Sequence, residues 1–255
     1  MQTQTAMKKI SETQSRAGRR FTLTALLAVC LLLAASPQAQ AASLCGYSQA
    51  EGWQYVELGV YPQTMEGGLE PILWRVLSVE DGRAYLVSEY VLLHRRIHPD
   101  DAAYVLSGGL FTATEMYEFL NGAFLESFTQ EERTLFQEDA LGGCITLLSA
   151  DDLRDRSLGF GTDAARMAFG TPYALANGLY QYGRDYGGAS PYWTRTQNPK
   201  ATYGATCTKA GGGLGYIRVV VQNEGCRPAC TLRLDALRIQ SGWGTRTNPF
   251  RLKPV

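Results

Sequence analysis

The stretch 190–232 constrains the fold more than any other part of this chain. An aromatic run, 192–196, is followed by a segment rich in Gly, Asn and Thr, and then by an apolar run, 215–221. A turn at 223–225 leads into a last run, 226–232. Runs of β-branched and aromatic residues bounded by Gly and Asn predict strands. We therefore expect a C-terminal hairpin, preceded by a long loop excursion that leaves the run 192–196.

The first 41 residues have the three regions of a secretory signal peptide. A basic segment ends at Arg20, an apolar run covers 23–35, and Ala39-Gln40-Ala41 provides the small residues of a cleavage site. The apolar run is shorter than the roughly 20 residues that span a bilayer, so an uncleaved membrane anchor is the weaker alternative. We predict cleavage after Ala41, export to the periplasm or the extracellular space, and no stable membrane span afterwards.

Cleavage would leave 214 residues, enough for one well-buried core. They carry 19 Lys and Arg against 23 Asp and Glu, a net charge of about −4. This balance argues against a nucleic-acid partner, because such proteins usually present a basic face. The C-terminal part is locally basic, which a solvated surface explains; the alternative is a patch for an anionic ligand. The basic residues of this part are Arg218, Arg227, Arg233, Arg238, Arg246, Arg251 and Lys253.

Five cysteines would remain after cleavage: Cys45, Cys144, Cys207, Cys226 and Cys230. Export to an oxidising compartment predicts disulfides, and the odd number leaves one thiol free or paired between chains. Cys226 and Cys230 lie in one extended run, about 13 Å apart, which exceeds the roughly 7 Å limit for a disulfide. The preferred bridge joins Cys207 to either Cys226 or Cys230, because it would tie down the expected loop.

A β-hairpin is predicted early in the chain. The apolar runs 71–79 and 83–88 are joined by Glu80-Asp81-Gly82, and Asp-Gly between two such runs is a strong hairpin signal because the turn needs positive φ. A strand at 54–58 precedes them, after a short tether over 42–52. The expected core residues of this sheet are Ile72, Trp74, Val76, Tyr85 and Val87.

The middle of the chain has helix signals. Capping boxes, in which a Thr or Ser is followed three residues later by an acid, occur at 112–115, 129–132 and 149–152. The first precedes an apolar face made by Met116, Phe119, Leu120, Ala123 and Phe124. Thr171-Pro172 begins another helix, with Thr as the cap and Pro in the first turn. Since no internal repeat is present, the simplest account is a single α+β domain.

Eight short motifs follow one another along 54–234. They are Leu-Gly-Val-Tyr-Pro-Gln (58–63), Pro-Ile-Leu-Trp-Arg-Val-Leu (71–77), Leu-Asn-Gly (120–122) with Phe124, Phe-Thr-Gln-Glu-Glu-Arg (128–133), Thr-Leu-Leu-Ser (146–149), Thr-Pro-Tyr-Ala (171–174), Tyr-Trp-Thr-Arg (192–195) and Arg-Pro-Ala (227–229). Together they resemble an uncharacterised bacterial domain family, a domain of unknown function common in exported and surface proteins. That family is distantly similar to the C-type-lectin-like fold, which formylglycine-generating enzymes share.

The resemblance implies a C-type-lectin-like domain over 53–234, with small antiparallel sheets, flanking helices and a long loop excursion that forms the binding surface. Residues 235–255 would be a C-terminal extension. The binding candidates are Tyr192, Trp193, Arg195, Tyr203 and Arg227, because a Trp and an Arg at a loop mouth can stack on a sugar ring and pair with a carboxylate. The alternative, which we favour for Trp193 and Arg227, is a core Trp and a buried Arg ion pair.

Catalytic chemistry has little support in the sequence. His94 and His98 have the i, i+4 spacing of a zinc pair but precede Pro99 in an expected loop, and no Gly-x-Ser-x-Gly elbow is present. We predict no catalytic residue, no metal and no cofactor. The first hypothesis is therefore an exported, non-catalytic binding or structural module for a glycan or a protein. The second is an exported enzyme that acts on cell-envelope or protein substrates through a free cysteine.

Overall fold

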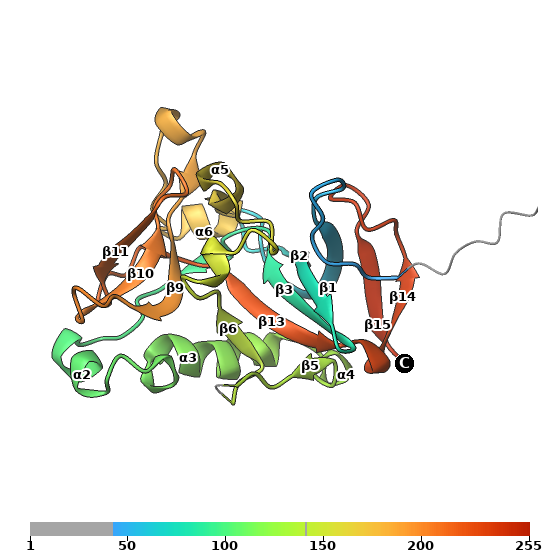
Figure 1. Ribbon diagram of the computed structural model, residues 1–255, viewed down its shortest axis with the longest axis horizontal. Helices are drawn as coiled ribbons and strands as arrows, with labels where there is room; N and C mark the ends of the chain where they lie inside the picture. Colours follow the sequence, from blue (N-terminus) through green and yellow to red (C-terminus); the bar gives the residue numbers. More distant parts are fainter. Residues whose placement is uncertain (1–42, 141) are drawn as a thin grey trace, which may run out of the picture. The chain divides into compact units, whose positions relative to one another are not determined.

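Figure 1 shows the computed structural model, which describes residues 43–140 and 142–255. The predicted signal peptide, 1–41, lies outside the described residues. Among the residues that are described, no helix has both the length and the apolar character needed to cross a bilayer. The combination of sheets with short helices confirms the α+β class predicted from the sequence.

The large sheet contains eight strands in the order β14-β15-β1-β2-β3-β13-β5, with β6 also pairing with β13. The strands are β1 (Gln54–Pro62), β2 (Leu69–Glu80), β3 (Arg83–Ser88), β5 (Phe136–Gln137), β6 (Ile145–Leu147), β13 (Pro228–Arg233), β14 (Leu237–Ser241) and β15 (Phe250–Pro254). The pair β1–β15 is parallel, and the other pairs of this sheet are antiparallel.

The β2–β3 hairpin forms as the Asp-Gly signal predicts. Asp81 and Gly82 have φ of 49° and 72°, the left-handed geometry that a two-residue turn of type I′ requires. Of the predicted core residues, Ile72, Trp74, Val76 and Val87 are fully buried, whereas Tyr85 is half-buried and donates its hydroxyl to Asp152. The local turn signal thus predicted the hairpin, and an irregularity between Val76 and Ser78 shifts the register further along β2.

The small sheet contains five strands in the order β11-β10-β9-β12-β4. Its strands are β4 (Leu93–His94), β9 (Tyr192–Gln197), β10 (Gly204–Thr208), β11 (Leu214–Arg218) and β12 (Gly225–Cys226). A separate two-stranded ribbon joins β7 (Ala168–Phe169) to β8 (Ala189–Ser190).

The long loop excursion predicted between the runs 192–196 and 215–221 is not formed. The segment contains β10, which pairs with β9 on one side and with β11 on the other. Ala205 and Cys207 are buried on one face of β10, and Thr206 and Thr208 are buried on the other. Threonine is a good strand former, so the composition that suggested a loop also suits a strand between two neighbours.

The predicted C-terminal hairpin is also not formed. The run 226–232 is divided between β12 of the small sheet and β13 of the large sheet, and β11 pairs with β10 instead. On β13, Ala229 lies opposite Val87 of β3. β13 is buried on nearly its whole length, as expected of a central strand, whereas β11 is half-exposed, as expected of an edge strand. The two runs therefore have different neighbours.

The helices are short, and each of the five α-helices begins after a residue whose side chain accepts a hydrogen bond from the first turn. They are α2 (Asp101–Leu106), α3 (Glu115–Phe119), α4 (Gln130–Arg133), α5 (Asp163–Arg166) and α6 (Pro172–Ala176), with a π-helical turn at Leu120–Phe124. The capping box at Thr129 and the Thr171-Pro172 start are confirmed. The predicted capping box at 112–115 is wrong. Residues 111–113 form a 3-10 turn with Phe111 buried, so the helix α3 begins later and its cap is Thr114. The π turn changes the phase of the apolar face, which leaves Met116, Leu120 and Phe124 buried, Phe119 half-buried and Ala123 exposed.

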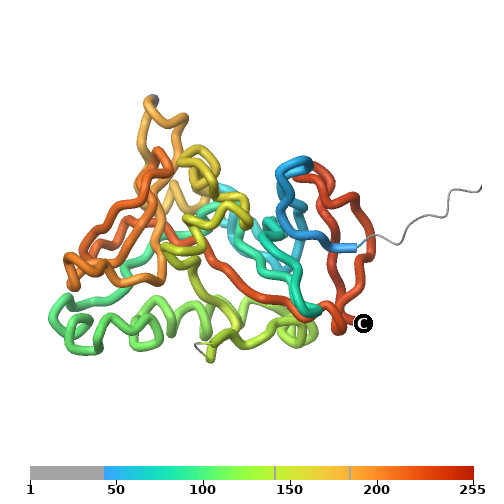
Figure 2. The backbone as a smooth tube through the Cα atoms, in the orientation of Figure 1, coloured from blue at the N-terminus to red at the C-terminus, as the bar shows by residue number. Residues whose placement is uncertain are grey.

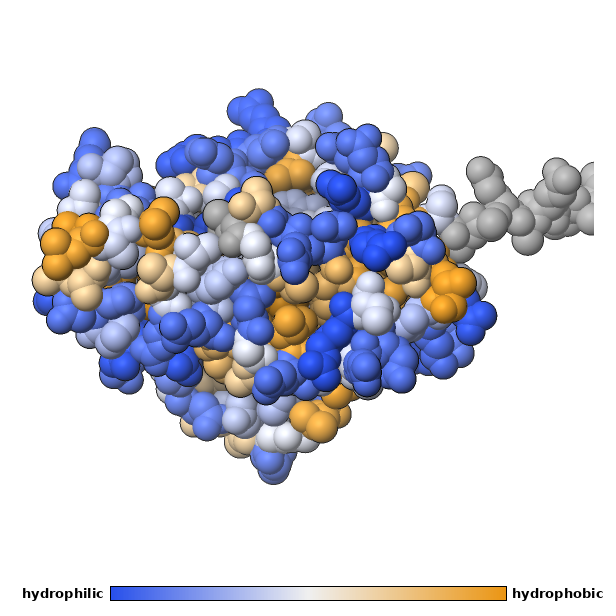
Figure 3. Space-filling model, turned by 90° about the horizontal axis from the view of Figure 1, so that it is seen from below, coloured by the Kyte–Doolittle hydropathy of each residue, from blue (hydrophilic) through white to orange (hydrophobic). Residues whose placement is uncertain are grey.

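Both faces of the large sheet are covered. Val76 and Leu86 belong to the main core, and Leu77 and Val87 belong to a second core, because successive side chains alternate across a strand. The main core also takes in Trp193 from the small sheet, so the two sheets share it. The segment α2–α4 runs along the lower side of the molecule in Figure 1. Seen from below in Figure 3, that side is largely hydrophilic with separate hydrophobic patches.

The segments predicted as a tether and an extension are parts of the packed fold. Leu44 joins the main core, and Tyr47 donates its backbone N–H to the Leu77 carbonyl oxygen at 3.0 Å. Residues 235–255 add β14 and β15 to the large sheet, with Val56 of β1 opposite Phe250 of β15. Turn signals such as Asp-Gly predict only local hairpins and do not reveal pairing between distant strands. The predicted domain boundary at 234 therefore falls inside the folded domain.

Two aromatic residues of this C-terminal segment give a matched test. Phe250 is 4% exposed and Trp243 is 80% exposed. Phe250→Ala should lower the free energy of unfolding by about 3 kcal/mol because it leaves a core cavity, whereas Trp243→Ala should change it by less than about 0.5 kcal/mol. Urea unfolding followed by circular dichroism measures both. Equal, small effects would mean that 235–255 is a dispensable extension after all.

Candidate functional site

Tyr192 and Trp193, two of the predicted binding residues, are core residues. Trp193 is fully buried and donates its indole N–H to the Arg95 carbonyl oxygen at 2.7 Å. Tyr192 is 1% exposed and donates its hydroxyl to the Arg166 carbonyl oxygen at 2.8 Å. Because neither ring reaches solvent, the structural alternative holds for Trp193 and applies to Tyr192 as well.

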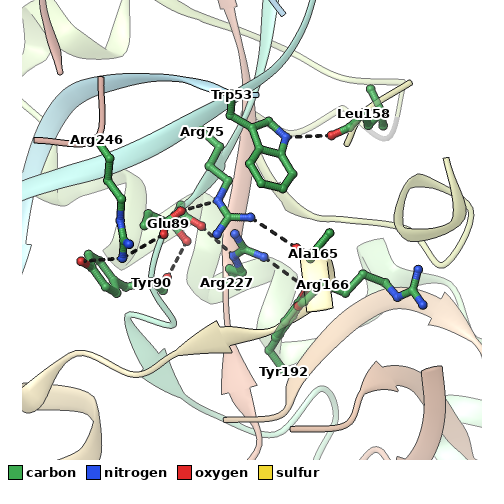
Figure 4. A network of polar contacts seen from close by, with 11 residues as sticks. Trp53, Arg75, Glu89, Tyr90, Leu158, Ala165, Arg166, Tyr192, Arg227 and Arg246 are labelled. Carbon is green, nitrogen blue, oxygen red and sulfur yellow. Dashed lines mark hydrogen bonds and ion pairs between the residues drawn. The ribbon is translucent and has the colours of Figure 1, made fainter. Parts of the chain in front are cut away.

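Arg227 is a buried brace, shown in Figure 4. It is 1% exposed, and it donates from Nε to the Ser88 carbonyl oxygen at 2.7 Å and from Nη1 to the Tyr192 hydroxyl at 3.2 Å. Its contacts are thus with neutral groups rather than with the ion-pair partner that the sequence suggested. Burial lowers the pKa of its guanidinium, and its Nη2 has no hydrogen-bond partner among the described residues.

Arg195 and Tyr203 lie apart from this brace. Arg195 donates from Nη1 to the Leu147 carbonyl oxygen and to Asp152 at 3.3 Å. Tyr203 is 43% exposed and lies at a separate hollow beside α2. The five predicted binding residues therefore do not converge on one site.

The predicted disulfide between Cys207 and either Cys226 or Cys230 is not formed. In the part of the chain that the structure describes, all five cysteines are free. β9 lies between the strands of Cys207 and Cys226, so their backbones are about 10 Å apart at the usual strand spacing, beyond bridging reach. Cys230 belongs to the other sheet. Burial raises the pKa of all three thiols, which disfavours the reactive thiolate.

The two histidines make contacts within the chain. The His94 ring nitrogens lie 2.7 Å from the Gln222 carbonyl oxygen and 2.6 Å from the Asn177 carbonyl oxygen. His98 Nδ1 lies 2.7 Å from the Asp100 carbonyl oxygen. Within the described ranges, no three His, Cys, Asp or Glu side chains gather to hold a metal ion.

A pocket that the sequence reasoning missed lies at one end of the small sheet. We call it the tyrosine pocket; its volume is about 660 Å³. The loop after α6, the turn between β10 and β11, and the turn before β12 surround it. Its principal side chains are Tyr180, Tyr182, Tyr186, Tyr216, Lys209 and Glu224.

The loop 179–188 holds three of these tyrosines in the open. It projects beside the small sheet at the top of Figure 2. Tyr180 donates its backbone N–H to the Asn223 carbonyl oxygen at 3.0 Å, which ties the loop to the turn before β12. The rings of Tyr180, Tyr182 and Tyr186 meet edge to face, 5.2 and 5.9 Å apart, and each ring is 43–44% exposed. Exposed aromatic rings held in place are typical of binding surfaces.

The turn between β10 and β11 closes the opposite wall. Lys209 donates its backbone N–H to the Gly213 carbonyl oxygen at 2.8 Å, so the glycine-rich segment is a tight hairpin turn. A Cβ atom on Gly211 would lie 2.6 Å from the Tyr186 ring, so only glycine lets this ring reach the turn. The spacing of Tyr180, Tyr182 and Tyr186 near glycines was the available sequence signal for the tyrosine wall.

A buried acid lies at the bottom of the tyrosine pocket. Glu224 is 4% exposed and its carboxyl contacts the Cys207 thiol. Burial raises the pKa of Glu224 to about 7. Burial, and then the Glu224 charge, raise the pKa of Cys207. The pocket thus combines aromatic walls with a carboxyl that can be neutral or charged near neutral pH.

The raised pKa of Glu224 predicts a pH-dependent stability. The folded protein holds this proton more tightly than the unfolded chain, whose Glu pKa is near 4.5, so the stabilisation is full below pH 4.5 and is lost as pH rises to 7. The loss should be at most about 3 kcal/mol. Urea unfolding at pH 5 and pH 8 should show a smaller difference for Glu224→Gln than for the wild type. The exposed control Glu66→Gln should keep the wild-type difference, and an unchanged difference in Glu224→Gln would contradict the assignment.

Comparison with known proteins gives no match: no protein-family model, no curated protein and no solved structure matches this chain.

Proposed function

We propose that the protein is an exported, non-catalytic binding module whose ligand is a glycan held in the tyrosine pocket. The observation that carries the proposal is the set of half-exposed tyrosine rings around a hollow of about 660 Å³ with a buried carboxyl at its base. Export rests on the predicted signal peptide. The volume falls in the usual range of small-ligand pockets.

The chemistry of the pocket suits a sugar better than an apolar ligand. Tyrosine rings offer flat apolar faces to the C–H side of a sugar, and their hydroxyls remain available for hydrogen bonds. Glu224 and Lys209 add an acceptor and a donor for sugar hydroxyls. The alternative ligand is a protein, which a binding screen with peptides would identify.

We also propose that the domain is C-type-lectin-like and belongs to the exported family that its motifs resemble. Its α+β class and the small antiparallel sheet that carries the pocket support this assignment. The lack of a long loop excursion weighs against it. An experimental structure that superposes on a C-type-lectin-like domain over both sheets would establish the fold.

A pair of tyrosine variants tests the pocket. Tyr182→Ala should weaken glycan binding about tenfold, because stacked rings contribute about 1 kcal/mol or more. Tyr203→Ala is the matched control, since Tyr203 is equally exposed at 43% but lies outside the pocket. A glycan array followed by calorimetry on the best binder measures both. Equal affinities of Tyr182→Ala and wild type, or binding only in a peptide screen, would refute the glycan proposal.

A second candidate function is an enzyme that uses a free cysteine. One observation favours it: the Cys207 thiol lines the tyrosine pocket and contacts Glu224, which could accept its proton. Against it, the carboxylate disfavours the neighbouring thiolate, and catalytic cysteines usually have lowered pKa values. The binding module is therefore the better-supported function.

Thiol labelling distinguishes the two candidates. With iodoacetamide at pH 7.5, the exposed Cys45 should react in the native protein, whereas Cys207, Cys226 and Cys230 should react only after unfolding. Mass spectrometry of the labelled peptides gives the site. Rapid native labelling of Cys207, together with an activity lost in Cys207→Ser, would favour the enzyme.

A further inference from the structure

Another hollow, of about 410 Å³, lies between the N-terminal segment 45–55 and the connection from β14 to β15. We call it the tryptophan hollow. Trp243 stands at it with 80% of its surface exposed, more than any other aromatic side chain among the described residues. The side chains that matter here are Ser48, Glu51, Trp53, Trp243, Thr245 and Arg246.

The backbone holds Trp243 in this exposed position. Trp243 donates its N–H to the Asn248 carbonyl oxygen at 3.0 Å, and Tyr55 of β1 donates its N–H to the Gly244 carbonyl oxygen at 2.8 Å. The connection is therefore closed by a hydrogen bond of its own and attached to β1 next to the indole. An exposed indole on a fixed backbone gives a ligand a flat apolar surface at low entropic cost.

Arg246 gives the hollow a positive charge that the protein only partly neutralises. Its Nη2 contacts the Glu89 carboxylate and the Tyr90 hydroxyl, each at 3.2 Å. Nε and Nη1 make no hydrogen bond to any described residue. Glu89 also pairs with Arg75 (Figure 4), and its charge acts on the nearby Arg227, whose hydrogen bonds go to neutral groups. Three guanidiniums thus surround one buried carboxylate, and the exposed acid Glu51 is the other charge at the hollow.

We propose that the tryptophan hollow binds a sugar ring that carries a carboxylate. The apolar face of the ring would stack on Trp243, and the carboxylate would accept a charge-assisted hydrogen bond from Nε or Nη1 of Arg246. Ser48 and Thr245 place hydroxyls beside the ring. The surplus of guanidiniums behind Arg246 favours an anion over a neutral or cationic ligand. This proposal does not rest on the tyrosine pocket, which lies on the small sheet.

Two glycosides that differ only at C6 test the proposal: methyl β-D-glucuronide, which is charged, and methyl β-D-glucoside, which is neutral. Saturation-transfer NMR on the purified protein measures their binding. We expect a dissociation constant on the order of 1 mM for the glucuronide and binding about tenfold weaker for the glucoside. Trp243→Ala, which removes an exposed side chain and should fold normally, should abolish binding of both.

Arginine variants test the charge. Arg246→Gln should remove the preference for the glucuronide, whereas Arg251→Gln should keep it. Arg251 is a matched control because it is also exposed and also pairs with a carboxylate, that of Glu57 at 3.1 Å. Equal affinity of the wild type for the two glycosides, no binding of either, or full preference in Arg246→Gln would overturn the proposal. Tyr182→Ala should leave this binding unchanged, so the two proposals can fail separately.

Discussion

The rest of the structure depends on one buried cation. Arg227 lies between β12 and β13, where the chain passes from the small sheet to the large sheet. Its guanidinium bonds to the Ser88 carbonyl oxygen at the end of β3 and to the Tyr192 hydroxyl on β9, one contact in each sheet. Burying a charge is costly unless hydrogen bonds replace water. The two sheets must therefore stay together for Arg227 to keep its partners.

This constraint separates the aromatic residues into two groups. Trp74 and Trp193 fill the core that the sheets share, and each gives its indole N–H to a carbonyl oxygen, of Leu58 and Arg95 respectively. Four exposed aromatics lie on connecting segments: Tyr180, Tyr182 and Tyr186 on the loop 179–188 beside the small sheet, and Trp243 on the β14–β15 connection. Rigid sheets with aromatic side chains on their connecting segments are a suitable scaffold for ligand binding.

Local signals in the sequence predicted local structure well. Asp81-Gly82, the Thr129 capping box and Thr171-Pro172 each act within four residues, and the structure confirms all three. Strand partners are different. Nothing near the run 226–232 indicates that its second half pairs with β3, about 140 residues earlier. Such pairing depends on which faces are buried, and the sequence pattern alone leaves several partners open.

The candidate site shows the same limit. The expectation of a tryptophan and an arginine beside a ligand was assigned to Trp193, which is buried in the core, and to Arg195, which pairs with Asp152. The same two residue types occur at Trp243 and Arg246, in a segment predicted to be an extension. Identical residue types cannot be told apart by composition, since exposure is decided by the surrounding fold.

The most direct test of the account measures how strongly Arg227 couples the two sheets. Native-state hydrogen exchange of Arg227→Met should show that the amides of β9 and β10 lose more protection than those of β2 and β3, because the small sheet loses its brace while the hairpin keeps its own contacts. An equal loss of protection in both sheets, or none in either, would contradict the claim that Arg227 joins them.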